Sequence, residues 1–398
     1  MRLISSSWSR FASNTRSIAF QRTLAGMLLA AALGIAPGAS AQDVVVIRPF
    51  AGDRFATLPT EANFPEGITA DPTSGDLFVG TFDAPPDGTG TNFLLRFDRK
   101  GRLEAQLPLG PIPLTGLAFN PRDGKVYWAR PGALAGADSS IQRVAANFDA
   151  STPVEDVAIV PNIGAPADRV EQSVDGQPIA IVFPDSVAFP NGLVFRSSDG
   201  TLFVTDSLQA AVFQLADPSL ADNTCPTSSD CVQLTLQSPL LASATFPQLG
   251  VNGIEIAADG QTLLVTNTGD DRLLSLAEDG TLAVVTESLE GADGVVRGLD
   301  GTLIVSRALG DELAIIDPAS GRILAEIGEF RGIRRDGSVR GLLFPGSIVR
   351  VGNQLFANNL ALPLTGSPSE PEVDVTTYTI ARIRLPRRLD TVDVAPLP

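Results

Sequence analysis

Histidine is absent from this chain of 398 residues, and cysteine occurs only twice. Without histidine, the chain cannot form a Ser-His-Asp or Cys-His catalytic group, nor a zinc or iron centre that uses imidazole ligands. Two cysteines are too few for a four-thiolate metal site. A metal ion bound here must therefore have oxygen ligands, and acid–base chemistry must rely on carboxylates, lysine, tyrosine or water.

Long apolar runs are missing as well, with one exception near the N-terminus. Residues 24–35 are largely apolar and precede the small-residue sequence Ala-Ser-Ala at 39–41. The region before this run has no acidic residue and carries Arg2, Arg10, Arg16 and Arg22. This order predicts a secretory signal peptide, residues 1–41, whereas a membrane anchor would need a longer apolar run. We therefore expect an exported protein, periplasmic or extracellular, with no membrane contact after cleavage.

The charge balance is strongly acidic. The formal net charge is −16, and loss of the four arginines of the signal peptide takes it to −20. Such a field repels nucleic acid and anionic lipid and attracts cations. We therefore expect no nucleic-acid partner, and we expect a monomer that acts on a small-molecule substrate.

The two cysteines lie close together in a polar segment, Cys225-Pro-Thr-Ser-Ser-Asp-Cys231. In an oxidising compartment this spacing predicts a disulfide between Cys225 and Cys231. Closing so small a loop contributes roughly 2 kcal/mol in the chain-entropy description. A catalytic role is the less favoured alternative.

A repeated unit sets the expected architecture. Each copy has a glycine-led apolar strand, a turn that is often Asp-Gly, and a second apolar strand, which together are typical of a β-hairpin. The copies cover residues 65–79, 114–128, 190–206, 251–267, 292–306 and 345–356. Six units that each supply four strands predict an all-β fold, a six-bladed β-propeller with four-stranded antiparallel blades over residues 42–398. An open sandwich would not need six matched hairpins, and residues 44–47 are expected to complete the last blade.

Polar residues occupy one repeated position, directly before the glycine that opens each unit. In chain order they are Glu66, Thr115, Asn191, Asn252 and Asp293, with Pro345 in the sixth unit. The first strand of a propeller blade lines the central tunnel, so these positions converge at one end of it. Asn-Gly and Asp-Gly are also ordinary turn dipeptides, which is the alternative for any single copy. Four oxygen-bearing residues at the same phase instead predict a metal site on Glu66, Asn191, Asn252 and Asp293.

Calcium is the cation that this ligand set favours. Two carboxylates in a confined tunnel would repel each other, and a divalent ion neutralises them. Mixed carboxylate and carboxamide ligands, completed by water, suit calcium better than the strict octahedron of magnesium. The residues that end each second strand are predicted to surround the same mouth, where ordinary loop polarity is the alternative to substrate contact. With Thr115, the candidate substrate-binding residues are Arg130, Asp206, Asn267, Arg307 and Asn358, and Thr81 has the same phase.

The ordered Glu-Gly, Asn-Gly, Asn-Gly and Asp-Gly pairs resemble those of the regucalcin/gluconolactonase (senescence marker protein-like) family and its relatives, the calcium-dependent phosphotriesterases and lactonases. The resemblance spans roughly residues 60–385. It implies a six-bladed propeller, one divalent ion at the tunnel mouth, and hydrolysis of lactones or organophosphates. It also implies that Asp293 is the general base or nucleophile.

Two functions follow from this sequence, and they belong to different classes. The first is a calcium-dependent hydrolase of lactones or related esters and phosphotriesters. Relatives of the paraoxonase type use histidines near the metal, which this chain lacks, and Arg130 and Arg307 match the family's substrate arginine only by position. The second is a non-enzymatic propeller that calcium stabilises and that binds a partner through long loops. Those loops are expected near residues 131–185, 217–248 and 362–376.

Overall fold

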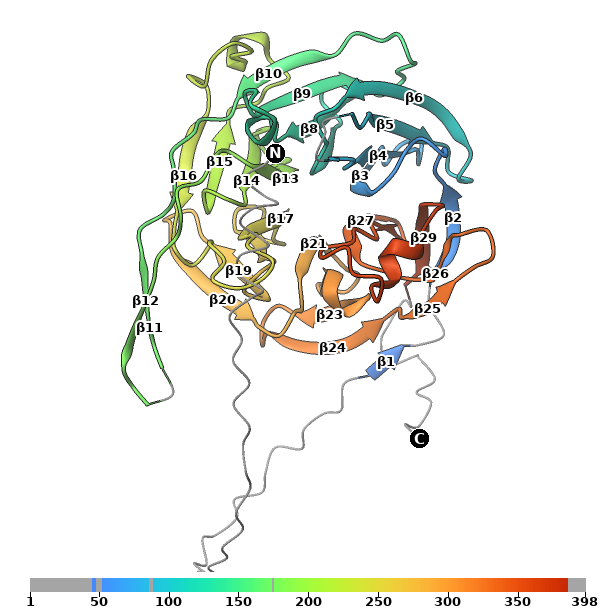
Figure 1. Ribbon diagram of the computed structural model, residues 1–398. Helices are drawn as coiled ribbons and strands as arrows, with labels where there is room; N and C mark the ends of the chain where they lie inside the picture. Colours follow the sequence, from blue (N-terminus) through green and yellow to red (C-terminus); the bar gives the residue numbers. More distant parts are fainter. Residues whose placement is uncertain (1–44, 48–51, 86–88, 174, 386–398) are drawn as a thin grey trace, which may run out of the picture.

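Six sheets form blades around a central tunnel in the computed structural model of this protein, of which five have four strands and one has five (Figure 1). The structure describes residues 45–47, 52–85, 89–173 and 175–385. The four core strands of each blade pair antiparallel, and in five of the blades these strands follow one another in chain order from the tunnel outward. The prediction of a six-bladed β-propeller with four-stranded antiparallel blades is thus confirmed. The predicted signal peptide, residues 1–41, lies outside the described residues and stays a prediction.

The blades are named here in chain order, from the innermost strand of each. The first has β3 (Pro65–Ala70), β4 (Leu77–Thr81), β5 (Asn92–Phe97) and β6 (Leu103–Gly110). The second has β7 (Leu117–Asn120), β8 (Lys125–Arg130), β9 (Ser140–Ala145) and β10 (Glu155–Ile159). The third has β13 (Pro190–Phe195), β14 (Leu202–Asp206), β15 (Ala211–Leu215) and β16 (Gln233–Gln237).

The other three blades repeat this order. The fourth has β17 (Val251–Ile256), β18 (Leu263–Asn267), β19 (Arg272–Leu276) and β20 (Leu282–Thr286). The fifth has β21 (Ala292–Arg297), β22 (Leu303–Arg307), β23 (Glu312–Asp317) and β24 (Arg322–Ile327). The sixth has β27 (Pro345–Val351), β28 (Gln354–Asn359) and β29 (Thr379–Arg384), and its outermost strand comes from elsewhere in the chain.

That outermost strand is β2 (Asp53–Thr57), which pairs antiparallel with β29 and so closes the ring. The expectation that residues 44–47 complete the last blade was wrong. Instead β1 (Val45–Ile47) adds a parallel fifth strand to the fifth blade, beside β24. In β2, Ala56 is buried and the ring of Phe55 packs edge-on against Phe356, with 4.7 Å between ring centroids. This contact with the core fixes β2 at the sixth blade.

The core lies between the blades, because both faces of each sheet are covered by neighbouring sheets. All residues of β4, β14, β18 and β22 are buried for this reason. Trp128 and Tyr127 are the largest of the fully buried side chains. Full burial of one large apolar side chain contributes roughly 1.5–3 kcal/mol, so the packing between blades holds the ring rigid around the tunnel.

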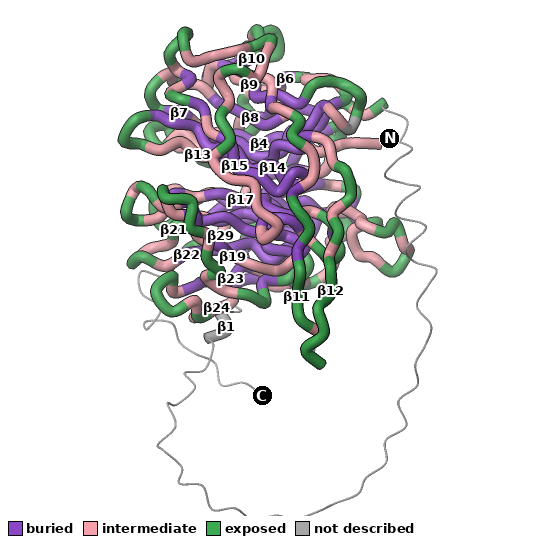
Figure 2. Tube along the Cα trace, turned by 90° about the vertical axis from the view of Figure 1, so that its left-hand side faces the viewer, coloured by how far each residue is buried: buried purple, intermediate pink, exposed green. Residues whose placement is uncertain are grey.

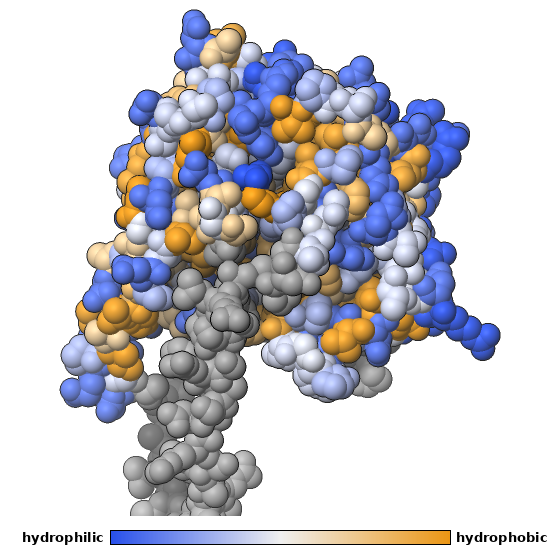
Figure 3. Space-filling model, turned by 45° about the horizontal axis from the view of Figure 1, so that its top comes forward, coloured by the Kyte–Doolittle hydropathy of each residue, from blue (hydrophilic) through white to orange (hydrophobic). Residues whose placement is uncertain are grey.

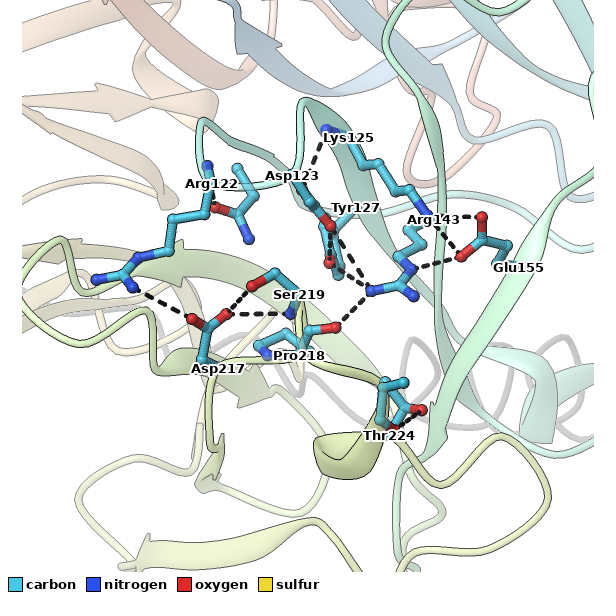
Figure 4. A network of polar contacts seen from close by, with 12 residues as sticks. Arg122, Asp123, Lys125, Tyr127, Arg143, Glu155, Asp217, Pro218, Ser219 and Thr224 are labelled. Atoms are coloured by element: carbon cyan, nitrogen blue, oxygen red, sulfur yellow. Dashed lines mark hydrogen bonds and ion pairs between the residues drawn. The ribbon is translucent and has the colours of Figure 1, made fainter.

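The seam between the second and third blades also carries a polar network (Figure 4). The hydroxyl of Tyr127 donates to Asp123 Oδ2 at 2.6 Å, and Arg143 Nη1 donates to that hydroxyl at 2.8 Å. Arg143 also bonds Glu155 at 2.8 Å and donates to the carbonyl of Pro218 in the third blade. Burial raises the pKa of Tyr127, which therefore stays neutral and serves as a structural hydrogen-bonding group.

Insertions extend beyond the blades. The hairpin of β11 (Arg169–Gln172) and β12 (Pro178–Ile181) projects from the ring and is largely exposed (Figures 1 and 2). Its base is held by an ion pair between the buried Arg169 and Asp270, at 2.8 Å. A second hairpin, β25 (Phe330–Ile333) and β26 (Val339–Gly341), precedes the sixth blade.

Short 3-10 helices complete the described elements: η2 (Gly132–Ala135), η3 (Ala221–Asn223), η4 (Ala308–Gly310) and η5 (Pro371–Asp374). No helix in the described ranges has the length and hydropathy that a membrane span requires. Cys225 and Cys231 form a disulfide with 5.7 Å between their Cα atoms. The loop that they close docks on the second blade, where Cys225 N donates to the carbonyl of Val157 at 2.8 Å. On the outer surface, hydrophilic residues are interspersed with separate apolar groups (Figure 3).

Candidate functional site

Four innermost strands place an oxygen-bearing side chain at one equivalent position. Glu66, Asn191, Asn252 and Asp293 are each the second residue of β3, β13, β17 and β21, and none is more than 6% exposed. The residue before each of them pairs with the last residue of the blade's second strand, and an irregularity in the pairing follows. Because this register is shared, the structure brings the four predicted ligands to the same end of the tunnel.

The glycines that follow these residues pack against the innermost strand of the next blade. A Cβ atom added to Gly192 would lie 2.4 Å from Asn252 O, and one added to Gly253 would lie 2.3 Å from Asp293 O. Real Cβ atoms essentially never come closer than 3.0 Å to another heavy atom. Neither glycine has a positive φ, so neither is needed for a turn. The glycines let neighbouring innermost strands approach each other, which argues against turn dipeptides.

The two carboxylates of this cluster have no partner among the described residues that would stabilise their charge. Burial raises the pKa of Glu66 well above its ordinary value, and the nearby charge of Asp293 adds to this. Burial likewise raises the pKa of Asp293 to about 7. No described residue donates a hydrogen bond to either group, and Glu66 Oε2 and Asp293 Oδ1 are fully buried. Buried carboxylates in this state are a frequent sign of a bound cation.

The two amides complete a set of four oxygen donors. Asn191 and Asn252 each direct Nδ2 to a hydroxyl, that of Ser207 at 3.1 Å and that of Thr268 at 3.0 Å. Neither Oδ1 accepts a hydrogen bond from a described residue, so both remain available to a cation. The described residues include no group of three or more His, Cys, Asp or Glu side chains that could hold a metal. A metal in this tunnel therefore depends on the amide oxygens, and the donor set fits a hard divalent cation such as calcium.

The sixth blade contributes no side chain to this cluster. Pro345 pairs with Asn359, as Val251 pairs with Asn267, so Gly346 and not Pro345 is equivalent to the ligands. This corrects the phase that the sequence suggested. A Cβ atom on Gly346 would lie 3.1 Å from Glu66 Oε2, so the position faces that carboxylate. We call the position of Gly346, which carries no side chain and lies on the blade between those of Asp293 and Glu66, the open sector.

The second blade also withholds a ligand. Thr115 occupies the equivalent position there, but its hydroxyl donates to the carbonyl of Pro190 at 2.8 Å. It therefore links the second blade to the third. Because the hydroxyl proton is used in this bond, Thr115 could contact substrate only as a hydrogen-bond acceptor.

Two of the residues that end a second strand brace loops. Asp206 accepts hydrogen bonds from Phe189 N and Gln209, and Asn267 donates to Leu240 O and Ala242 O. These bonds, like those below, occupy their polar groups within the protein, and the contact of these residues with substrate stays a prediction. Strand side chains alternate, so the last residue faces the side opposite the residue before it.

Two arginines and one threonine share this position with different outcomes. Arg307 forms ion pairs with Glu290, Glu312 and Glu326, so its charge is neutralised away from the tunnel. The hydroxyl of Thr81 donates to Asn92 Oδ1 at 3.1 Å. Arg130 makes one hydrogen bond to a described residue, Asp138 O at 3.3 Å, and stays a candidate for substrate contact.

Asn358 lies one position earlier in its strand than the other five, because Asn359 is the residue that pairs with Pro345. Its Nδ2 donates to the carbonyl of Glu66 at 2.7 Å. Thr205 and Thr266 have the same role in other blades, where their hydroxyls donate to Asn252 O and Asp293 O, each at 2.5 Å. Asn358 thus supports the main chain of a ligand, while its buried Oδ1 has no partner among the described residues.

Comparison with known proteins supports the fold and nothing finer. No family model matches the sequence, and no curated protein matches it. A solved luciferin-regenerating enzyme is similar in structure, with a TM-score of 0.53 and 12% identity, over 86% of this chain and 95% of that chain. A streptogramin B lyase has a TM-score of 0.50 and 11% identity, over 84% of this chain and 97% of that chain. Both similarities lie at the level of the propeller.

Proposed function

We propose that this protein is an exported, calcium-dependent hydrolase of lactones or related esters and phosphotriesters. One observation supports this most directly: two buried carboxylates that accept no hydrogen bond from a described residue flank the open sector, where the sixth blade carries a glycine. A site that only stabilised the fold could be completed at this position by a further side-chain ligand. Export is proposed from the N-terminal sequence, and the resemblance to lactonases and phosphotriesterases agrees with the reaction.

Glu66, Asn191, Asn252 and Asp293 would hold the ion. When bound there, calcium supplies Lewis-acid polarisation of a carbonyl or phosphoryl oxygen. Asp293 stands beside the open sector, and its carboxylate accepts no hydrogen bond from a described residue. It can therefore take a proton from an attacking water or attack the substrate itself. The neighbouring blades exclude bulk water from the carboxylate, which strengthens electrostatic interactions with substrate.

Apolar side chains border the open sector. A Cβ atom on Gly346 would lie 3.5 Å from Leu360, the same residue that packs with Ala308 and Phe344 in one cluster. The cluster also includes Phe64, which directly precedes the strand of Glu66. An ester or lactone with an apolar substituent matches this setting, because the polar reacting group can face the carboxylates while the substituent faces the cluster.

A binding propeller is the second candidate function. The projecting hairpin of β11 and β12 exposes Val170 to 67% and Ile179 to 49%, and Val182 just beyond it is 69% exposed. Apolar side chains on an exposed hairpin are a feature of protein-binding segments. In this alternative, calcium stabilises the tunnel and the hairpin contacts the partner.

The deciding experiment uses the mature protein with and without its ion. Metal analysis after desalting is expected to find close to one equivalent of calcium. Turnover of a panel of lactones, aryl esters and phosphotriesters should be lost after metal removal and restored by calcium. Calcium binding without turnover of any substrate in the panel would favour the binding propeller, and absence of calcium binding would exclude both functions.

A further inference from the structure

The two amides of the site are held in the same way, by hydroxyls that the sequence repeat did not reveal. Ser207 and Thr268 are each the first residue after the second strand of their blade, and they are only 2% and 3% exposed. Each accepts a hydrogen bond from the asparagine of its own blade. The motif thus recurs in the third and fourth blades, on both amides.

The direction of these hydrogen bonds is fixed by a carbonyl. Ser207 Oγ lies 2.6 Å from Val251 O, and Thr268 Oγ1 lies 2.8 Å from Ala292 O. A carbonyl can only accept, so each hydroxyl must give its single proton to it. The hydroxyl oxygen can then only accept from the amide. It follows that each asparagine presents its NH2 group to the hydroxyl and its Oδ1 to the opposite side.

We infer that Ser207 and Thr268 are positioning residues that make Asn191 and Asn252 present oxygen, and not nitrogen, to the tunnel. This inference rests on the proposed calcium site. A carboxamide has nearly the same shape either way round, but a cation is repelled by its NH2 group. A hydroxyl that donates its proton to a carbonyl disfavours the orientation in which the amide NH2 faces the tunnel, because that orientation would place the amide oxygen against the hydroxyl oxygen, and both are acceptors.

The same bonds link consecutive ligands. Val251 directly precedes Asn252, and Ala292 directly precedes Asp293. Each hydroxyl therefore joins the side chain of one ligand to the strand that carries the next. Orientation and spacing of the donors are set together, before any cation arrives.

Calorimetric titration of the metal-free protein with calcium chloride at pH 8 tests this directly. Ser207→Ala and Thr268→Val remove the hydroxyl with little change in volume, and each is expected to weaken calcium binding 10–100-fold, the usual range for a residue that orients a ligand. Thr268→Ser restores the hydroxyl and should bind within about 3-fold of the wild type.

Ser139→Ala is the matched control for Ser207→Ala. Ser139 is 3% exposed, and its hydroxyl also bridges two blades, because it accepts from Ala133 N at 3.1 Å and donates to Ala188 O at 2.7 Å. Within the described part of the chain, it makes no hydrogen bond to any of the four predicted ligands. The variant should lower the melting temperature of the metal-free protein but keep calcium affinity within about 3-fold. If Ser139→Ala weakens calcium binding as much as Ser207→Ala does, blade packing explains the effect and the inference is overturned.

A double-mutant cycle separates orientation from general damage. A carboxylate has oxygen on both sides, so Asn252→Asp needs no orienting hydroxyl. In that background, Thr268→Val should change calcium affinity by less than about 3-fold, in place of the larger loss expected with Asn252. An equal loss in both backgrounds would overturn the inference while leaving the calcium site intact. A wild-type protein that binds no calcium would overturn the site and the inference together.

Discussion

The stability of the metal-free protein should fall as the pH rises, because Asp293 must ionise without a partner. Its pKa is about 7 in the folded protein against an ordinary value of 3.8, and burial is the cause. Between these values the folded state holds more protons than the unfolded state, so its free energy of unfolding decreases with pH and levels off above pH 7. From pH 5 to pH 8 the loss for Asp293 alone is about 3 kcal/mol. The raised pKa of Glu66 has the same sign and adds to it.

Calcium should reverse this dependence, since the ionised carboxylates are the form that binds it. The assay is thermal unfolding of metal-depleted protein at pH 5 and pH 8, with and without added calcium. The wild type should lose on the order of 5 °C between the two pH values, and calcium at 100 times its dissociation constant should return about 2.7 kcal/mol at pH 8. Asp293→Asn should show a much weaker pH dependence and a much smaller calcium effect.

Asp311→Asn is the matched control for this measurement. Burial raises the pKa of Asp311 to about 6, but it lies outside the four oxygen donors and accepts one hydrogen bond, from Phe344 N at 2.8 Å. Its φ of 58° is one that asparagine adopts readily. The variant should lose a small part of the pH dependence and keep the full calcium effect. An unchanged pH dependence in Asp293→Asn would refute the reasoning, because the variant lacks the group to which the dependence is assigned.

Four further outcomes are expected. At saturating calcium, turnover by Asp293→Asn should fall by roughly 10²–10⁴, and undiminished turnover would exclude its role as base or nucleophile. Gly346→Asn places a side chain in the open sector; calorimetric titration should show that calcium still binds, and product assays should show that turnover is lost. Gly253→Ala should destabilise the protein by about 1–3 kcal/mol in urea unfolding, since its Cβ would overlap Asp293 O. Thiol titration of denatured, unreduced protein should find no free thiol at Cys225 or Cys231, and two free thiols would contradict the pairing.

The blade count and the shared strand position of the four predicted ligands could be predicted from the sequence, because both depend on a local pattern that recurs six times. In the sixth blade, the position predicted to be equivalent to the ligands was wrong by one residue. There the glycine that anchored the comparison, Gly346, occupies the ligand position itself, and Ser347 takes the place of the usual glycine. Only the pairing of Pro345 with Asn359 reveals this, and such a register is a relation between strands that one strand's sequence does not contain.

Side-chain direction at the tunnel mouth was also out of reach. Polar residues end several second strands, but whether they face the tunnel or the loops depends on the irregular pairing near each strand's end. The closing strand posed a similar problem. Residues 45–47 and Asp53–Thr57 are both short segments near the first blade, and tertiary packing of Phe55 on Phe356 decides which of them joins the sixth.

The closure of the ring by β2 has a mechanical consequence for the site. The sixth blade is assembled from two segments far apart in the sequence, because β2 pairs with β29, and Arg54 of β2 also forms an ion pair with Asp336 at 2.7 Å. Glu66 and Asp293 lie on the first and fifth blades, which flank the sixth. An ion bound by both residues would link the two blades across the sixth, so that separation of the sixth blade from its neighbours would also require the ion to dissociate from its oxygen ligands. Variants that release calcium faster should therefore also be cut faster by proteases at β2.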